Sequence, residues 1–148
     1  MDRIDRQAIV DETLRWVGTP YQHVQGLKGP HGGVDCVYLL YGVAQAVGAL
    51  PQTAARPVYS AQAHLHQTQE HYRTALEAVG CQPVAWSDRQ PGDILLVRFG
   101  QVASHAAILV GPDEIVHAHA RHGVVRQRIP GSWWARLVAI YRFPGVPA

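Results

Sequence analysis

The hydrophobic pattern of this chain changes its period near residue 80. Before that point, apolar residues recur at helical spacing in three segments, 5–17, 36–47 and 61–79, each followed by a glycine. After it, apolar and polar residues alternate in five short segments separated by turn residues: 94–99, 104–110, 115–119, 124–129 and 137–143. Helices followed by a run of strands predict an α+β fold, with N-terminal helices packed on an antiparallel meander of about five strands.

The composition predicts one globular domain, residues 1–148, large enough to bury a core without disulfides. Hydrophobic residues make up 47% of the chain, and a net charge of +2 argues against binding to nucleic acid or to a membrane surface. Two cysteines, Cys36 and Cys81, form no disulfide framework and are typical of a reducing compartment. We see no signal peptide and no apolar run of about 20 residues, so we expect synthesis in the cytoplasm.

The stretch from Gly32 to Tyr41 contains the strongest chemical signal. Two glycines lead into Asp35–Cys36, and an apolar, helix-compatible run follows immediately. Asp35 is a good N-cap, which places Cys36 in the first turn of a helix, where free backbone N–H groups favour negative charge. The sequence therefore predicts a thiol whose pKa is lowered toward the nucleophilic thiolate.

A nucleophilic cysteine needs a base and a group that orients the base, and His105 and His117 are the candidates. Both lie in strands joined by a hairpin, so the length of the turn decides whether they share a face. A two- or four-residue turn places them on opposite faces. A three-residue loop, 111–113, pairs residues whose numbers add to 224, and in that register His105 and His117 lie on one face as diagonal neighbours.

Other interpretations of the histidines stay open at this stage. His119 is on the same face as His117 and competes with it as the third catalytic residue. The pair could also ligate zinc, with Cys36 or Asp93 adding a ligand, although the spacing matches no helical metal motif. Trp133 and the neighbouring Trp134 are more typical of a lid over the sheet than of a sugar-binding platform.

Five motifs occur in an order and spacing that resemble the NlpC/P60 cell-wall peptidases, which are papain-like cysteine enzymes. The similarity covers most of the chain, and its ending further resembles the branch found in tails of phages and gene-transfer agents. The chain has Val37–Tyr38 where that family usually has Ser-Gly, so we expect its peptide preference to differ there. The motifs are Thr19-Pro20-Tyr21, Gly33-Val34-Asp35-Cys36, Gln90-Pro91-Gly92-Asp93, Ser104-His105-Ala106-Ala107-Ile108 and Val116-His117-Ala118.

The resemblance implies a role for each matching residue. Cys36 would be the nucleophile, His105 the general base, His117 the residue that orients the base, and Tyr21 a hydroxyl near the forming oxyanion. It implies no cofactor and no metal. Residues close to Cys36 or His105 in the sequence are expected to contribute to substrate binding: Asp35, Val37, Tyr38 and Ser104.

The function implied is a cell-wall cysteine endopeptidase that cleaves stem peptides of peptidoglycan by way of an acyl-enzyme, incorporated into a phage-like particle beside other tail proteins. Two alternatives remain. One is an amidase or acyl-transfer enzyme that uses the same Cys-His chemistry on another amide. The other is a structural tail-assembly protein that retains the fold. The sequence does not decide whether the loop 22–33 acts as a lid.

Overall fold

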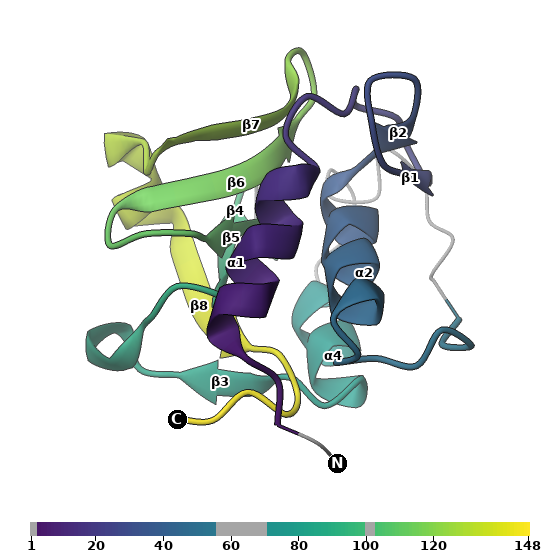
Figure 1. Cartoon of the computed structure of the whole chain (residues 1–148). Coiled ribbons are helices and arrows are strands. Elements are labelled where there is room, and N and C mark those ends of the chain that lie inside the picture. The colour runs from purple at the N-terminus through teal and green to yellow at the C-terminus, as the bar shows by residue number, and fades with distance from the viewer. Residues whose placement is uncertain (1–2, 56–70, 100–102) are drawn as a thin grey trace.

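The computed structural model describes residues 3–55, 71–99 and 103–148 (Figure 1). Three helices form where the sequence predicts them, although only the end of the third falls within these ranges and residues 61–70 lie outside the description. None of the helices within these ranges is both long and apolar enough to cross a bilayer. The helices are α1 (Arg6–Arg15), α2 (Cys36–Ala46) and α4 (His71–Ala78).

Helices α1 and α2 run side by side and pack closely (Figure 1). The indole of Trp16, at the C-terminal end of α1, lies over Gly42 in the middle of α2. A Cβ at residue 42 would lie 2.5 Å from that ring, so this contact requires glycine. The indole N–H donates to the buried Glu12 carboxylate at 3.1 Å, which holds the ring in place. This packing fixes the axis of the helix that begins at Cys36.

The main sheet has six antiparallel strands in the order β3-β8-β4-β5-β6-β7. All five predicted strands are present, and the prediction missed β3, a three-residue edge strand that contains Pro83, which an edge tolerates because one side needs no donor. The meander is confirmed only from β4 to β7, since β8 returns to pair with β4. The strands are β3 (Gln82–Val84), β4 (Ile94–Arg98), β5 (Ala103–Leu109), β6 (Glu114–His119), β7 (Gly123–Arg128) and β8 (Leu137–Arg142).

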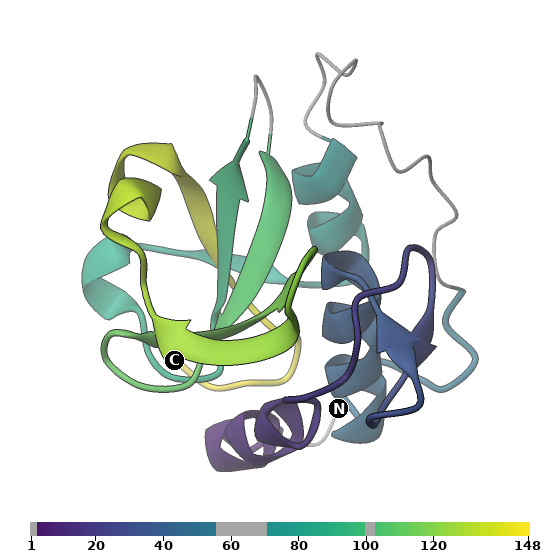
Figure 2. The same cartoon turned by 90° about the horizontal axis from the view of Figure 1, so that it is seen from above.

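The two faces of the sheet are covered differently. Alternate residues of the strands, such as Ala106 and Ile108, join the helices in the larger core cluster. Their neighbours, such as Ala107 and Leu109, form a smaller cluster with Trp133 on the other face. Trp133 comes from a 3-10 helix, η2 (Gly131–Arg136), that lies across the sheet from α1 and α2 (Figure 2). The predicted lid over the sheet is thus present in the side chain of Trp133.

The hairpin between β5 and β6 has the register that the site requires. Ile108 pairs with Val116 and Leu109 with Ile115, which is the register sum of 224. Val110 N–H donates to the carbonyl of Glu114 at 2.9 Å, and this bond closes a three-residue loop over 111–113. The odd loop predicted as the condition for placing both histidines on one face is confirmed.

The segment 22–33 is tied down at several points. It contains a short antiparallel ladder, β1 (Gly26–Leu27) with β2 (Gly33–Val34), that the sequence analysis did not predict. Lys28 Nζ donates to Glu12 of α1 at 2.7 Å, and Gly29 N–H donates to the side chain of Thr19 at 2.9 Å. The segment is therefore an anchored hairpin at the start of α2.

A buried ion cluster joins the start of the chain to its end. Asp93, which is fully buried, accepts two bonds of 2.9 Å from Arg142 in β8 and one of 3.2 Å from Arg6 in α1. It also accepts from the N–H of Gln90, so both carboxylate oxygens are occupied. The turn motif that contains Asp93 thus fastens α1, β4 and β8 together.

Replacing Asp93 with Asn should strongly destabilise the fold, because the Arg142 guanidinium would stay buried without its counter-charge. We expect the free energy of unfolding to fall by about 3–5 kcal/mol in urea denaturation. Glu114→Gln is the matched control, since Glu114 pairs with Arg126 at 3.1 Å on the surface and should cost under about 1 kcal/mol. Equal losses in the two variants would contradict the structural role of the buried cluster.

Candidate active site

Asp35 holds the start of α2 and the adjoining loop together. One carboxylate oxygen accepts from the N–H of Tyr38 at 2.9 Å, which is the predicted N-cap bond, and the other accepts from the N–H of Val24 at 2.8 Å. Val24 has φ of 54°, a conformation that this bond stabilises. The carboxylate is 1% exposed, so Asp35 positions Cys36 and has no surface open to a substrate. The expectation that it binds substrate directly does not fit this burial.

Cys36 lies against the main chain of β5. The backbone N–H groups of Ala106 and Val37 interact with the sulfur, and the hydroxyl of Tyr72 donates to Sγ over 3.7 Å. Tyr21 is close enough for a charge on Cys36 to raise the pKa of its phenol, although burial is the larger cause of that rise. The sulfur therefore has donors from three separate parts of the chain, α2, α4 and β5.

The pKa of the Cys36 thiol is higher than the sequence predicts. Burial raises it to about 11, and the carboxylate of Asp35 adds to the rise. The hydrogen bond from Tyr72 and the N–H groups of Ala106 and Val37 lower the pKa but do not offset burial. The predicted thiolate is wrong for the resting protein, because the helix start is covered by the sheet. With a pKa of about 11, the thiol is protonated at neutral pH.

His105 and His117 form a hydrogen-bonded pair. His105 Nε2 lies 2.8 Å from His117 Nδ1, and His117 Nε2 lies 2.9 Å from Oε1 of Gln127 in β7. The Trp133 ring packs on both imidazoles, with centroids 5.6 Å from His105 and 5.2 Å from His117. His119 instead accepts from the N–H groups of residues 121 and 122. His117, and not His119, is therefore hydrogen-bonded to His105, whereas its role as the third catalytic residue stays a prediction.

Both paired imidazoles are held neutral. Burial lowers the pKa of His105 to about 3, and the nearby His117 and His119 lower it further by charge repulsion. Burial also lowers the pKa of His117, against a smaller opposite effect from its bond to Gln127. At neutral pH each imidazole therefore keeps one nitrogen lone pair, which is the form a general base needs.

The cysteine and the histidine pair meet at the main chain of β5, since Ala106 contacts Sγ and His105 is the preceding residue. No hydrogen bond joins Cys36 to His105 within the described residues, and His105 Nδ1 has no partner there. Such bonds are often long without substrate and tighten in the complex.

The remaining predicted site residues are placed as follows. The side chain of Tyr21 is 39% exposed beside Cys36. Val37 is half-buried against the core, whereas Tyr38 is buried within it at 8% exposed, so its ring does not line an open surface. Ser104 belongs to β5, but its side chain lies outside what the structure describes.

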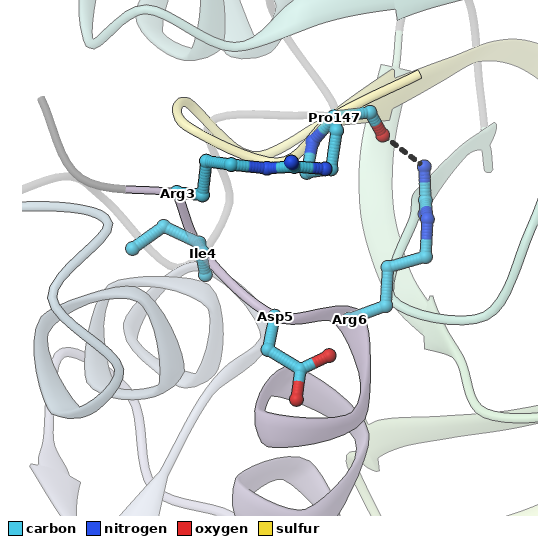
Figure 3. Close-up of a pocket in the computed structure, with 5 residues that line it drawn as sticks. All are labelled: Arg3, Ile4, Asp5, Arg6 and Pro147. Carbon is cyan, nitrogen blue, oxygen red and sulfur yellow. Dashed lines mark hydrogen bonds between the residues drawn. The ribbon is translucent and has the colours of Figure 1, made fainter.

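The described residues contain no group of metal ligands, and the cavity at the chain ends lies apart from Cys36 and the histidines. Within the described residues, no three His, Cys, Asp or Glu side chains form a group that could hold a metal, and Asp93 is already bound to two arginines. A cavity of about 370 Å³ lies at the N-terminus, where Arg6 donates to the carbonyl of Pro147 (Figure 3). None of the predicted site residues lines this cavity.

Comparison with known proteins places the chain in a family. Residues 18–142 match the NlpC/P60 family along their whole length. This chain belongs to the NlpC/P60 family. The match includes Cys36, His105 and His117, and it runs from the residue before Thr19 to the end of β8. The family resemblance predicted from the five motifs is therefore confirmed.

Two curated relatives carry different descriptions, one as an endopeptidase and one as a phage tail protein. Probable endopeptidase Rv2190c of Mycobacterium tuberculosis is 39% identical over 127 residues, which are 85% of this chain but 26% of that protein. The chain thus spans about a quarter of the length of the mycobacterial relatives it matches. Tail tip assembly protein K of Escherichia phage lambda is 30% identical over 152 residues, covering 96% of this chain and 74% of the phage protein. The phage-tail branch of the family is thereby supported.

Solved NlpC/P60 domains share the fold at low identity. The domain of the peptidoglycan hydrolase SagA superposes with a TM-score of 0.56 at 23% identity and covers 93% of this chain and 97% of its own. RipD of Mycobacterium tuberculosis, described as a non-catalytic domain adapted to peptidoglycan binding, gives a TM-score of 0.59 at 13% identity and covers 93% of this chain and 95% of its own. The fold by itself therefore does not distinguish a catalytic member from a non-catalytic one.

Sequence reasoning missed two residues of the site, Tyr72 and Gln127. Tyr72 lies in the third predicted helical segment, 61–79, and was not singled out, although the hydroxyl of a tyrosine packed against a core usually finds a hydrogen-bond partner. Gln127 stands between two arginines in β7, where nothing in its neighbours signals a role. Both contacts depend on chain segments far apart in sequence.

Tyr72→Phe should raise the pKa of Cys36 above that of the wild type, because the hydroxyl stabilises the thiolate. We expect alkylation of Cys36 at pH 8 to slow by about tenfold or more, as a hydrogen bond to a charged group contributes about 1.5–3 kcal/mol. The measurement is the rate of iodoacetamide labelling against pH, in a Cys81→Ala background so that one thiol reports. An unchanged rate would contradict the contact.

Proposed function

We propose that this protein is a cysteine endopeptidase that cleaves the stem peptides of bacterial peptidoglycan, at the tail of a phage-like particle. The observation that carries the proposal is the neutral His105–His117 pair, which leaves Nδ1 of His105 without a partner beside the strand that contacts Cys36. The endopeptidase and phage-tail relatives support the substrate class and the setting.

The chemistry begins with a neutral thiol and a neutral base. As Cys36 Sγ attacks the peptide carbonyl, the thiol proton passes to Nδ1 of His105, and the oxyanion is stabilised by the Tyr21 hydroxyl and N–H groups at the start of α2. The imidazolium then gives its proton to the leaving amine as the C–N bond breaks. Water, deprotonated by His105, hydrolyses the thioester and restores the thiol.

We propose that the half-buried Val37, next to Cys36 in the sequence, and Ser104, next to His105, contribute to recognition of the peptide. Val37 replaces a small polar residue of the usual family pattern. We propose that it gives the cleft an apolar wall next to Cys36 and so changes which peptide is preferred. Tyr38 supports that wall from within the core.

Incubation of the purified protein with peptidoglycan of several wall types tests the function. We expect newly freed amino groups with the wild type, and a fall of at least about a thousandfold with Cys36→Ala because the nucleophile is lost. Cys81→Ala is the matched control, since Cys81 is buried in the core and should be dispensable for cleavage. Mass spectrometry of the products separates cleavage within the stem peptide from cleavage at the sugar–peptide amide.

Activity that survives Cys36→Ala would contradict the mechanism. Absence of cleavage on every wall type would favour the structural alternative, a tail-assembly protein that uses the fold for docking. The lambda relative, which covers most of this chain, is the observation that keeps this alternative in view. Retention of Cys36, His105 and His117 together favours the enzyme.

In the proposed enzyme, kcat/KM should fall on the acid side only at a pH well below that of an ordinary histidine. Because burial lowers the pKa of His105 to about 3, the base stays unprotonated well below the ordinary histidine value of about 6.5. We expect kcat/KM on a soluble muropeptide at pH 5 to stay within a few-fold of its value at pH 7. A loss of activity centred near pH 6.5 would show that His105 is not buried in the neutral form.

A further inference from the structure

Gln127 is the end of a chain of hydrogen bonds that leads to the candidate base. Its Oε1 lies 2.9 Å from His117 Nε2, and its Nε2 donates to the carbonyl of Arg128 over 3.4 Å. The second bond identifies which end of the amide is nitrogen, because a carbonyl can only accept. The oxygen of Gln127 is therefore the end that faces His117.

This orientation determines where both imidazole protons are. An amide oxygen only accepts, so His117 must carry its proton on Nε2. The Nδ1 of a neutral His117 is then a lone pair, and His105 must donate to it from Nε2 across the 2.8 Å contact. His105 is left with its lone pair on Nδ1, the nitrogen that has no partner among the described residues.

The opposite orientation of the amide would reverse every bond. An N–H group at that point would require a lone pair on His117 Nε2, a proton on its Nδ1, and a lone pair on His105 Nε2. Nδ1 of His105 would then carry a proton and could not accept one. The two tautomers differ little in energy in free imidazole, so a single fixed acceptor is enough to select between them.

We propose that Gln127 is a positioning residue that selects the tautomer of His105 through His117 and so makes His105 Nδ1 the basic nitrogen. The catalytic consequence rests on the proposed function, whereas the tautomer itself does not. Burial strengthens the selection: His117 is 4% exposed, and Trp133 packs on both rings, so water cannot readily replace the amide.

Three variants test the proposal. Gln127→Leu removes the acceptor while filling its space, and should lower kcat by about 10–100-fold with little change in KM. Gln127→Glu keeps an acceptor at the same point, so it should retain activity within a few-fold while its charge moves the acid limb to higher pH. Arg126→Leu is the matched control on the same strand, because Arg126 lies on the opposite face of β7 and its ion pair among the described residues is with the half-exposed Glu114.

The tautomers can be read without any activity. Ring ¹⁵N shifts of histidine-labelled protein, assigned with His105→Gln and His117→Gln, should show Nε2-protonated imidazole for both residues in the wild type and in Gln127→Glu. In Gln127→Leu we expect a mixture of the two tautomers. Melting temperatures and Cys36 alkylation at pH 11, where the thiol ionises without a base, should be similar for all variants.

The outcomes separate this proposal from the proposed function. Nδ1-protonated His105 in the wild type, or unchanged tautomers in Gln127→Leu, would overturn it. Equal loss of activity in Gln127→Leu and Gln127→Glu would reduce Gln127 to a packing role and would also overturn it. If the wild type cleaves no wall but the shifts respond as described, the tautomer selection stands and the peptidase function fails.

Discussion

The packing of the N-terminal end of α2 onto the main chain of β5 is the contact on which the site depends. The small, buried Ala106 lies at this contact, and its N–H interacts with the sulfur of Cys36. This packing shields much of the half-buried thiol from water. The cost of forming a charge there then exceeds what the helix terminus and the Tyr72 hydroxyl contribute. The start of α2 therefore holds a neutral thiol, which under the proposed mechanism needs a base.

The imidazole of His105, the candidate base, lies with Trp133 on the face of the sheet opposite the helices. His117 is buried and His105 is half-buried where the ring of Trp133 packs on both, and the two imidazoles are joined in line with Gln127. Hydrogen bonds in such a dry environment are strong and directional, so the protons occupy defined nitrogens. The neutral thiol of Cys36 and the neutral imidazole of His105 both lie next to β5. A charge on either group is unfavourable, so in the proposed reaction each is charged only during proton transfer.

The family shows that this fold serves more than one purpose. Relatives include a probable endopeptidase and a phage tail tip assembly protein, and one structural neighbour is described as non-catalytic. A common fold therefore does not decide function, and the argument for catalysis in this chain comes from its own residues. In this chain, those residues are Cys36 and the His105–His117 pair, which is joined over 2.8 Å.

The sequence by itself determined the α+β class, the five predicted strands, the start of α2 at Cys36 and the candidate nucleophile and base. These follow from local pattern: hydrophobic period, an N-cap at Asp35 and turn residues. It also stated the condition on the hairpin, that only an odd loop puts His105 and His117 on one face. It could not choose the loop, because even and odd turns are both compatible with Gly111–Pro112.

Only the tertiary structure decided the three-residue loop, the choice of His117 over His119, and the contacts of Tyr72 and Gln127. It also reversed the expected direction of the Cys36 pKa. The physical reason is the same in each case. A hydrogen bond or a burial cost depends on which distant segments are brought together, and residues 36, 72 and 106 share no local pattern that would reveal their contact.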